Sequence, residues 1–138
     1  MFVDASAIIA ILTGEPEADA LADRLDEARA PITSPVAVFE AALGLSRKRH
    51  ASVAEAVADV RELLAAAGIR VIPLTDREAE TALDASARYG KGRGHPARLN
   101  MGDCFAYAMA KNHRVPLLFK GDDFSKTDIP SASSTGAA

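Results

Sequence analysis

The sequence has 138 residues, the usual size of one domain. Its 19 acidic residues outnumber its 16 lysines and arginines, and the net charge of -3 argues at first against a nucleic-acid partner. With 49% hydrophobic and only 5% aromatic residues, the chain can bury a core and is not disordered as a whole, but it has too few aromatic side chains to stack single-stranded bases.

Apolar stretches that suit short strands alternate along the chain with stretches that suit helices. Strands are predicted at residues 1–4, 31–33, 69–74 and 115–119. Helices are predicted to begin at Ser6, Glu15, Ser34, Ser52, Thr75 and Asn100. Some of these starts have a clear local cause, because Ser34 precedes a proline and Thr75 lies three residues before Glu78 in a capping-box pattern.

Two loops and a tail complete the chain. A glycine-rich basic loop is predicted over residues 90–99, and an acidic turn over residues 121–123. The alternation of strands and helices predicts one three-layer α/β/α domain over residues 1–130, with a mainly parallel central sheet and helices on both faces. Residues 131–138 are low in complexity and are predicted to form a flexible C-terminal tail.

Three acids stand in unexpected places. Asp4, Glu40 and Asp103 are each the only charged residue in a stretch of twelve residues that are otherwise mostly apolar or small. Such stretches form buried elements, and a buried carboxylate without a partner is strongly disfavoured. The basic residues gather elsewhere, at 47–49 and 88–98, and only Lys120 lies near an expected acid. A cation from outside the chain is therefore the better partner.

Several carboxylates without matching basic side chains suit a hard divalent cation, Mg²⁺ or Mn²⁺. Asp4 and the pair Asp122 and Asp123 follow predicted strands, so they lie at the sheet edge where α/β domains bind ligands. Each acid alone also has a structural explanation. Asp4 can cap the first helix beside Ser6, Asp103 can occupy the third position of a capped helix, and the Asp pair can be a solvated turn.

Taken together, these residues resemble the PIN-domain ribonucleases, and specifically the VapC toxins of type II toxin–antitoxin systems. The resemblance covers the chain from Met1 to about Ile129. It rests on FVDAS at 2–6, SPVAVFE at 34–40, GKGRGHPARLNMGDCFAYA at 90–108 and LLFKGDDF at 117–124. In the last motif two neighbouring acids fit the family's final acid, and the resemblance slightly favours Asp123 over Asp122. Asp128 is a more remote candidate.

The resemblance implies an Mg²⁺-dependent endoribonuclease, with Mn²⁺ as a substitute, that hydrolyses RNA through metal-activated water and leaves a 3′-hydroxyl and a 5′-phosphate. The implied catalytic residues are Asp4, Glu40, Asp103 and Asp123. The implied metal ligands are Asp4, Asp103, Glu40, Asp122 and Asp123, with Ser6 in support. RNA binding is expected from Arg88, Lys91, Arg93 and Arg98. The family also implies a cytoplasmic homodimer that inhibits translation and growth until a cognate antitoxin protein neutralises it.

Other functions fit the sequence less well. A phospho-receiver module needs paired acids after its first strand, where this chain has only Asp4, and an acceptor Asp after a middle strand. A catalytically inactive binding protein on the same fold remains an alternative. The single cysteine excludes an internal disulfide framework and indicates a reducing, cytoplasmic setting. No apolar run near the N-terminus reaches the roughly 20 residues of a membrane span, so no membrane association is expected.

Overall fold

The computed structural model describes residues 1–132. Within them the helices are α1 (Ala5–Thr13), α2 (Ala18–Glu27), α3 (Pro35–Arg49), α4 (Val53–Ala67), α5 (Asp76–Tyr89) and α6 (Met101–Asn112). The strands are β1 (Phe2–Val3), β2 (Ile32–Thr33), β3 (Arg70–Val71) and β4 (Leu117–Leu118), and a short 3-10 helix, η1, spans Phe124–Lys126.

The four strands form one parallel sheet in the order β3-β2-β1-β4. Phe2 of β1 is paired with Ile32 on one side and with Leu117 on the other. Because β1 and β4 are parallel neighbours, the turns that follow them lie at the same edge of the sheet. The Asp4 N–H donates to the Leu118 carbonyl at 3.0 Å, which fixes the first acid beside the end of β4.

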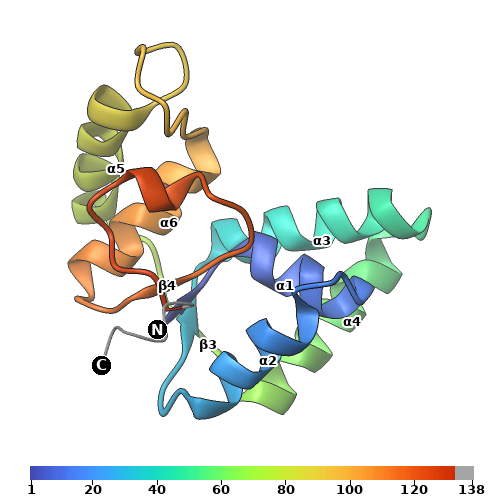
Figure 1. Ribbon diagram of the computed structural model, residues 1–138. Helices are drawn as coiled ribbons and strands as arrows, with labels where there is room; N and C mark the ends of the chain where they lie inside the picture. Colours follow the sequence, from blue (N-terminus) through green and yellow to red (C-terminus); the bar gives the residue numbers. More distant parts are fainter. Residues whose placement is uncertain (133–138) are drawn as a thin grey trace.

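The sheet separates two hydrophobic cores. Phe2 and Leu117 are buried in one core together with residues of α5 and α6, whereas Val3 and Leu118 are buried in the other with residues of α1, α3 and α4. This division follows from the alternation of side chains along a strand. Figure 1 shows α5 and α6 on one side of the molecule and α1 to α4 on the other. The predicted three-layer architecture with a parallel sheet is therefore confirmed.

The helices begin where local chemistry favours them. The Ser34 hydroxyl accepts a hydrogen bond from the Ala37 N–H at 3.1 Å at the start of α3. Thr75 and Glu78 form the predicted capping box of α5. Helix α4 ends at Gly68, which adopts the left-handed conformation that glycine tolerates without steric cost. These three predicted boundaries are confirmed. They could be predicted because each depends on residues close in the sequence.

Other boundaries differ from the prediction. Strand β3 occupies only Arg70–Val71 of the expected 69–74, and β4 only Leu117–Leu118 of 115–119. Pro73 and Pro116 lack the N–H that would extend the sheet pairing at those ends. Helix α2 begins at Ala18 rather than Glu15, because residues 15–17 form a turn.

The predicted tail begins two residues too early. Ser131 forms a bridge with Leu117, and the Ala132 N–H donates to the Leu117 carbonyl at 2.9 Å. These contacts hold both residues against β4, and Ala132 is buried there. The rest of the predicted tail, residues 133–138, lies outside the described residues. Among the described helices, none is long and apolar enough to cross a membrane.

Candidate active site

Asp4 is held at the amino end of α1. It is the N-cap residue of this helix and is only 5% exposed. Its Oδ2 accepts hydrogen bonds from the Ser6 N–H at 3.1 Å and from the Ser6 hydroxyl at 2.6 Å. Burial raises the pKa of Asp4, although the Ser6 hydrogen bonds oppose the rise, and the negative charge of Asp123 adds to it. The capping explanation is thus correct in geometry.

Glu40 lies inside α3, where no helix end explains it. Burial, together with the negative charges of Asp4 and Asp103, raises its pKa to about 7. Its carboxylate lies directly over Gly102 in the first turn of α6. A Cβ atom added at Gly102 would stand 2.0 Å from the Glu40 Oε2. Only a glycine leaves room for the carboxylate in this position.

Asp103 occupies the third position of α6. Its Oδ2 accepts from the Asn100 N–H at 3.1 Å, and its own N–H donates to the Asn100 side-chain oxygen at 2.8 Å. This reciprocal capping fixes the side chain. Burial nevertheless raises the pKa of Asp103 to about 6, the Asn100 hydrogen bond opposes the rise, and the charges of Asp4 and Asp123 add to it.

The acidic turn after β4 presents its two acids differently. The negative charge of Asp123 raises the pKa of both Asp4 and Asp103, so Asp123 faces these two residues. Asp122 is 79% exposed and lies 4.0 Å from the Lys126 ammonium instead. Asp123, rather than Asp122, is therefore the acid of this turn whose charge acts on Asp4 and Asp103.

Four acids from four segments thus share one region, and we call them the acidic cluster: Asp4, Glu40, Asp103 and Asp123. Within residues 1–132, no lysine, arginine or histidine forms an ion pair with any of them. Lys120, the one base expected nearby, is paired with Glu15 at 2.9 Å and Glu17 at 3.7 Å. Carboxylate oxygens without a cationic partner are the donors that Mg²⁺ and Mn²⁺ prefer.

The acidic cluster is more open than a filled metal site. Among the described residues, no three Asp, Glu, His or Cys side chains are close enough to hold an ion as they stand. Mg²⁺ is commonly held by one or two carboxylates together with water and substrate phosphate, so an ion at this site would keep several water ligands. Burial is the largest cause of the raised pKa values of Asp4, Glu40 and Asp103, and the negative charges of neighbouring acids add to it.

The basic residues expected to bind RNA fall into two groups. Lys91, Arg93 and Arg98 are exposed on the 90–99 loop, which Figure 1 shows projecting beyond α5. This loop is closed at its base, where the Lys91 N–H donates to the Leu99 carbonyl at 2.9 Å. Arg88 is different because its guanidinium donates to the Tyr89 hydroxyl at 2.7 Å and lies 3.7 Å from Asp128.

Asp128, the remote candidate, lies apart from the acidic cluster. It accepts from the Tyr107 hydroxyl at 2.5 Å and from the Lys111 ammonium at 3.2 Å. These contacts lower the pKa of Asp128, with the Tyr107 hydrogen bond as the largest cause. These partners give Asp128 a structural explanation that involves no metal.

Sequence reasoning missed the role of Gly102 and the partners of Lys120 and Asp128. The close contact between Gly102 and Glu40 joins α3 to α6, and Glu15 lies far from Lys120 along the chain. One signal was present, since a glycine beside Asp103 near the start of a helix is unusual. It could not indicate which side chain fills the space.

Comparison with known proteins gives a consistent result. The family model of the PIN domain matches residues 1–130. A VapC ribonuclease of Rhizobium meliloti is 42% identical over 139 residues, covering 93% of this chain and 98% of the relative. Ribonuclease VapC28 of Mycobacterium tuberculosis is 43% identical over 132 residues, covering 96% and 97%.

Two solved structures share the fold. The crystal structure of Mycobacterium tuberculosis VapC20, a sarcin-ricin loop cleaving toxin, has a TM-score of 0.71 at 20% identity and covers 93% of this chain and 95% of its own. A toxin–antitoxin complex from Klebsiella pneumoniae has a TM-score of 0.64, also at 20% identity, with coverage of 90% and 89%.

Proposed function

The chain belongs to the PIN-domain family, and on that premise we propose that it is a metal-dependent endoribonuclease, the toxin of a type II toxin–antitoxin module. The observation that carries the proposal is the acidic cluster: four carboxylates from separate segments, without a basic partner in residues 1–132, at the sheet edge where α/β domains bind ligands. The curated relatives named as VapC ribonucleases support the same activity.

We propose Asp4, Glu40, Asp103 and Asp123 as the residues that hold one or two Mg²⁺ ions, with Mn²⁺ as a substitute. When bound, the metal would lower the pKa of water and stabilise charge on the phosphate. The chain orients the ligands through Ser6, which fixes Asp4, and through the helix cap that fixes Asp103. Burial and the charges of Asp4 and Asp103 raise the pKa of Glu40 to about 7, and a neighbouring Mg²⁺ would lower it, so the ionised carboxylate could take a proton from the attacking water near neutral pH.

RNA is the proposed substrate, cut to leave a 3′-hydroxyl and a 5′-phosphate. Lys91, Arg93 and Arg98 stand exposed on the projecting loop, and their charges can follow the phosphate backbone. Arg88 contributes less directly to RNA binding because Tyr89 and Asp128 already engage its guanidinium. Hydrolysis of cellular RNA by such an enzyme would inhibit translation and growth, so we place the protein in the cytoplasm.

The proposed partners are a cognate antitoxin and a second copy of the chain. An antitoxin that inserts a basic side chain among the four carboxylates would compete directly with metal. A homodimer is supported by large apolar side chains at the surface: Phe39 is 65% exposed and precedes Glu40, Met101 is 73% exposed and precedes Gly102, and Leu83 on α5 is 70% exposed. Apolar surface of this kind is typical of contact with another protein.

The test is cleavage of total RNA with and without Mg²⁺, comparing the wild type with Asp4→Asn and Asp103→Asn. Each variant keeps the side-chain size and loses a charge, so we expect cleavage to fall by about 100-fold or more. Asp59→Asn, which removes an exposed carboxylate bound to Arg49, is the control and should cut at the wild-type rate. Equal rates in all four proteins would refute the assignment of the site.

The same assay addresses the alternatives. Membership of the PIN-domain family removes the phospho-receiver reading, which belongs to a different fold family. An inactive binding protein on this fold would show no Mg²⁺-dependent cleavage in the wild type under any condition that leaves the chain folded.

A further inference from the structure

Asp123 has no anchor of its own. It is exposed, and within residues 1–132 its side chain forms no hydrogen bond or ion pair. Its position against Asp4 and Asp103 must therefore be set by the rest of the stretch that carries it, which we call the 120–128 segment. In Figure 1 this segment runs on from β4 through η1 and passes α6.

The first end of the 120–128 segment is tied to the start of α1. The Lys120 N–H donates to the Ser6 hydroxyl at 3.0 Å, the same hydroxyl that donates to Asp4. The Lys120 ammonium reaches Glu15 at 2.9 Å. Just beyond Asp123, Phe124 is buried and packs edge-on against Phe119, with ring centroids 5.1 Å apart. These contacts fix one side of Asp123.

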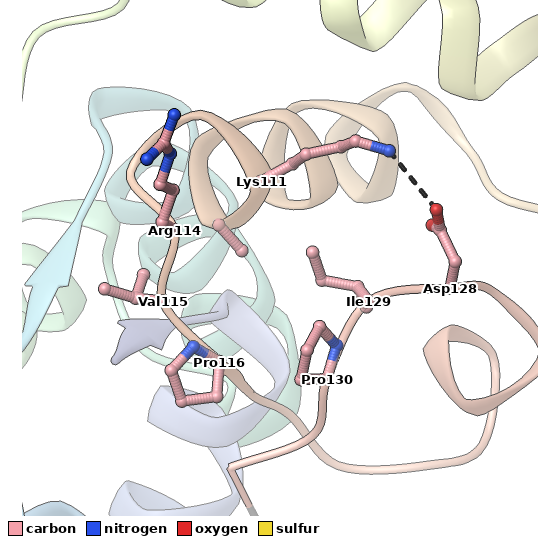
Figure 2. Close-up of a pocket in the computed structure, with 8 residues that line it drawn as sticks. Lys111, Arg114, Val115, Pro116, Asp128, Ile129 and Pro130 are labelled. Carbon is pink, nitrogen blue, oxygen red and sulfur yellow. Dashed lines mark hydrogen bonds and ion pairs between the residues drawn. The ribbon is translucent and has the colours of Figure 1, made fainter.

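The second end is tied to α6 through Asp128. Its Oδ1 accepts from the hydroxyl of Tyr107, a fully buried residue, at 2.5 Å, and its Oδ2 accepts from Lys111 at 3.2 Å. The Arg88 guanidinium lies 3.7 Å from the same oxygen. Figure 2 shows Lys111 extending from α6 toward Asp128, and both residues line a pocket of about 570 Å³.

The helix to which Asp128 is bonded, α6, also carries Asp103 of the acidic cluster. Tyr107 stands one turn beyond Asp103 on α6, so both side chains leave the helix on the same face. The Tyr107–Asp128 hydrogen bond therefore ties the segment bearing Asp123 to the helix face that bears Asp103. Asp128 is 47% exposed, and ion pairs at such exposed positions contribute little to overall stability. The network is better suited to fixing a position than to holding the fold together.

We propose that Tyr107 and Asp128 are positioning residues that hold Asp123 in place against Asp4 and Asp103. This inference rests on the proposed function, because it takes Asp123 to be a metal ligand. It differs from that function in naming two residues outside the acidic cluster on which metal binding depends.

Tyr107→Phe is the sharpest test, because it keeps the buried ring and removes only the hydroxyl. Two measurements on the full chain are needed: amide hydrogen exchange of residues 120–127, and Mn²⁺ affinity by calorimetry. We expect faster exchange in the segment and about 3- to 10-fold weaker Mn²⁺ binding, the equivalent of one lost hydrogen bond. Asp128→Asn should behave alike, and Asp59→Asn should match the wild type in both measurements.

A double-mutant cycle with Asp123→Asn separates positioning from a general loss of structure. If Tyr107 acts through Asp123, then Tyr107→Phe will weaken Mn²⁺ binding in the wild-type background and have almost no further effect beside Asp123→Asn. Unchanged exchange, or an equal loss of affinity in both backgrounds, would overturn the positioning role alone. A wild-type chain that bound no Mn²⁺ and cut no RNA would instead overturn the proposed function on which the role rests.

Discussion

Gly102 matters through the space that it leaves empty. The Glu40 carboxylate lies where a side chain at this position would stand, with Oε2 only 2.0 Å from the site of a Cβ atom. Because Gly102 directly precedes Asp103, the contact brings the carboxylate of α3 to the first turn of α6. The backbone of Gly102 has no positive φ angle, so its missing side chain, and not its flexibility, is what the structure uses.

Gly102→Ala should therefore separate activity from stability. Alanine favours the helix by up to about 1 kcal/mol over glycine, so the melting temperature should stay the same or rise. The added methyl group displaces the Glu40 carboxylate, and RNA cleavage should fall by about 10- to 100-fold, as expected for a misplaced reactive group. In a Glu40→Ala background the same substitution should have no further effect. A Gly102→Ala enzyme with wild-type activity would show that the position of Glu40 is not critical.

At the scale of elements, α5 and α6 are joined by a buried carboxylate that plays no part in the acidic cluster. Glu78 is 4% exposed. It accepts from the Thr75 N–H at 2.9 Å and from the Asn112 side-chain amide at 2.9 Å. Burial works to raise the pKa of Glu78, but these hydrogen bonds outweigh it and the pKa is lowered. The capping box seen in the sequence thus does more than start a helix, because it also links α5 to the end of α6.

Glu78→Gln should destabilise the protein by about 1–3 kcal/mol, because the amide turns a donor toward the donors of Thr75 or Asn112. Urea unfolding at pH 7 measures the loss. A carboxyl group with a lowered pKa stabilises the fold above its unfolded pKa, so the difference from wild type should shrink as the pH falls through the folded value. Glu80→Gln, on the exposed side of the same helix, is the control and should change stability little. A loss of equal size at Glu80 would contradict this reading.

The features that have a local cause could be predicted from the sequence, whereas those that depend on distant residues could not. Caps at Ser34 and Thr75 depend on neighbours within three residues, and the acids Asp4, Glu40 and Asp103 were marked by the apolar stretches around them. The choice between Asp122 and Asp123 could not be made from local pattern, and only the family resemblance slightly favoured Asp123, because the two acids are neighbours in one turn. The Tyr107–Asp128 contact spans 21 residues and has no local pattern.

At the scale of the whole molecule, the net charge of -3 has an uneven distribution. The four acids of the acidic cluster, when set aside, leave 15 acids against 16 lysines and arginines. The surface that remains is close to neutral, and exposed bases stand on the 90–99 loop. The acid excess that argued against a nucleic-acid partner is therefore concentrated in the site that we propose cuts RNA, and a bound divalent cation would cancel part of it.

The concentration of charge predicts how stability depends on pH and metal together. The pKa of Glu40 is raised from 4.5 to about 7 and that of Asp103 from 3.8 to about 6. An acid whose pKa is raised on folding stabilises the folded chain below its unfolded pKa and loses that contribution as the pH rises through the folded value. In a metal chelator, these groups should therefore make the protein less stable at pH 8 than at pH 5, by on the order of 1 kcal/mol after allowance for solvent screening.

Mg²⁺ binds the ionised form of the carboxylates, so it should raise the melting temperature by several degrees at pH 8 and by much less at pH 5. Thermal melts in chelator and in excess Mg²⁺ at both pH values measure this. The matched variant is Glu40→Gln combined with Asp103→Asn, which removes two of the three carboxyl groups with a raised pKa and leaves Asp4, so both the pH dependence and the metal response should become smaller. A wild-type response to Mg²⁺ of equal size at the two pH values would show that the ion does not bind at the carboxyl groups whose pKa values are raised into that pH range.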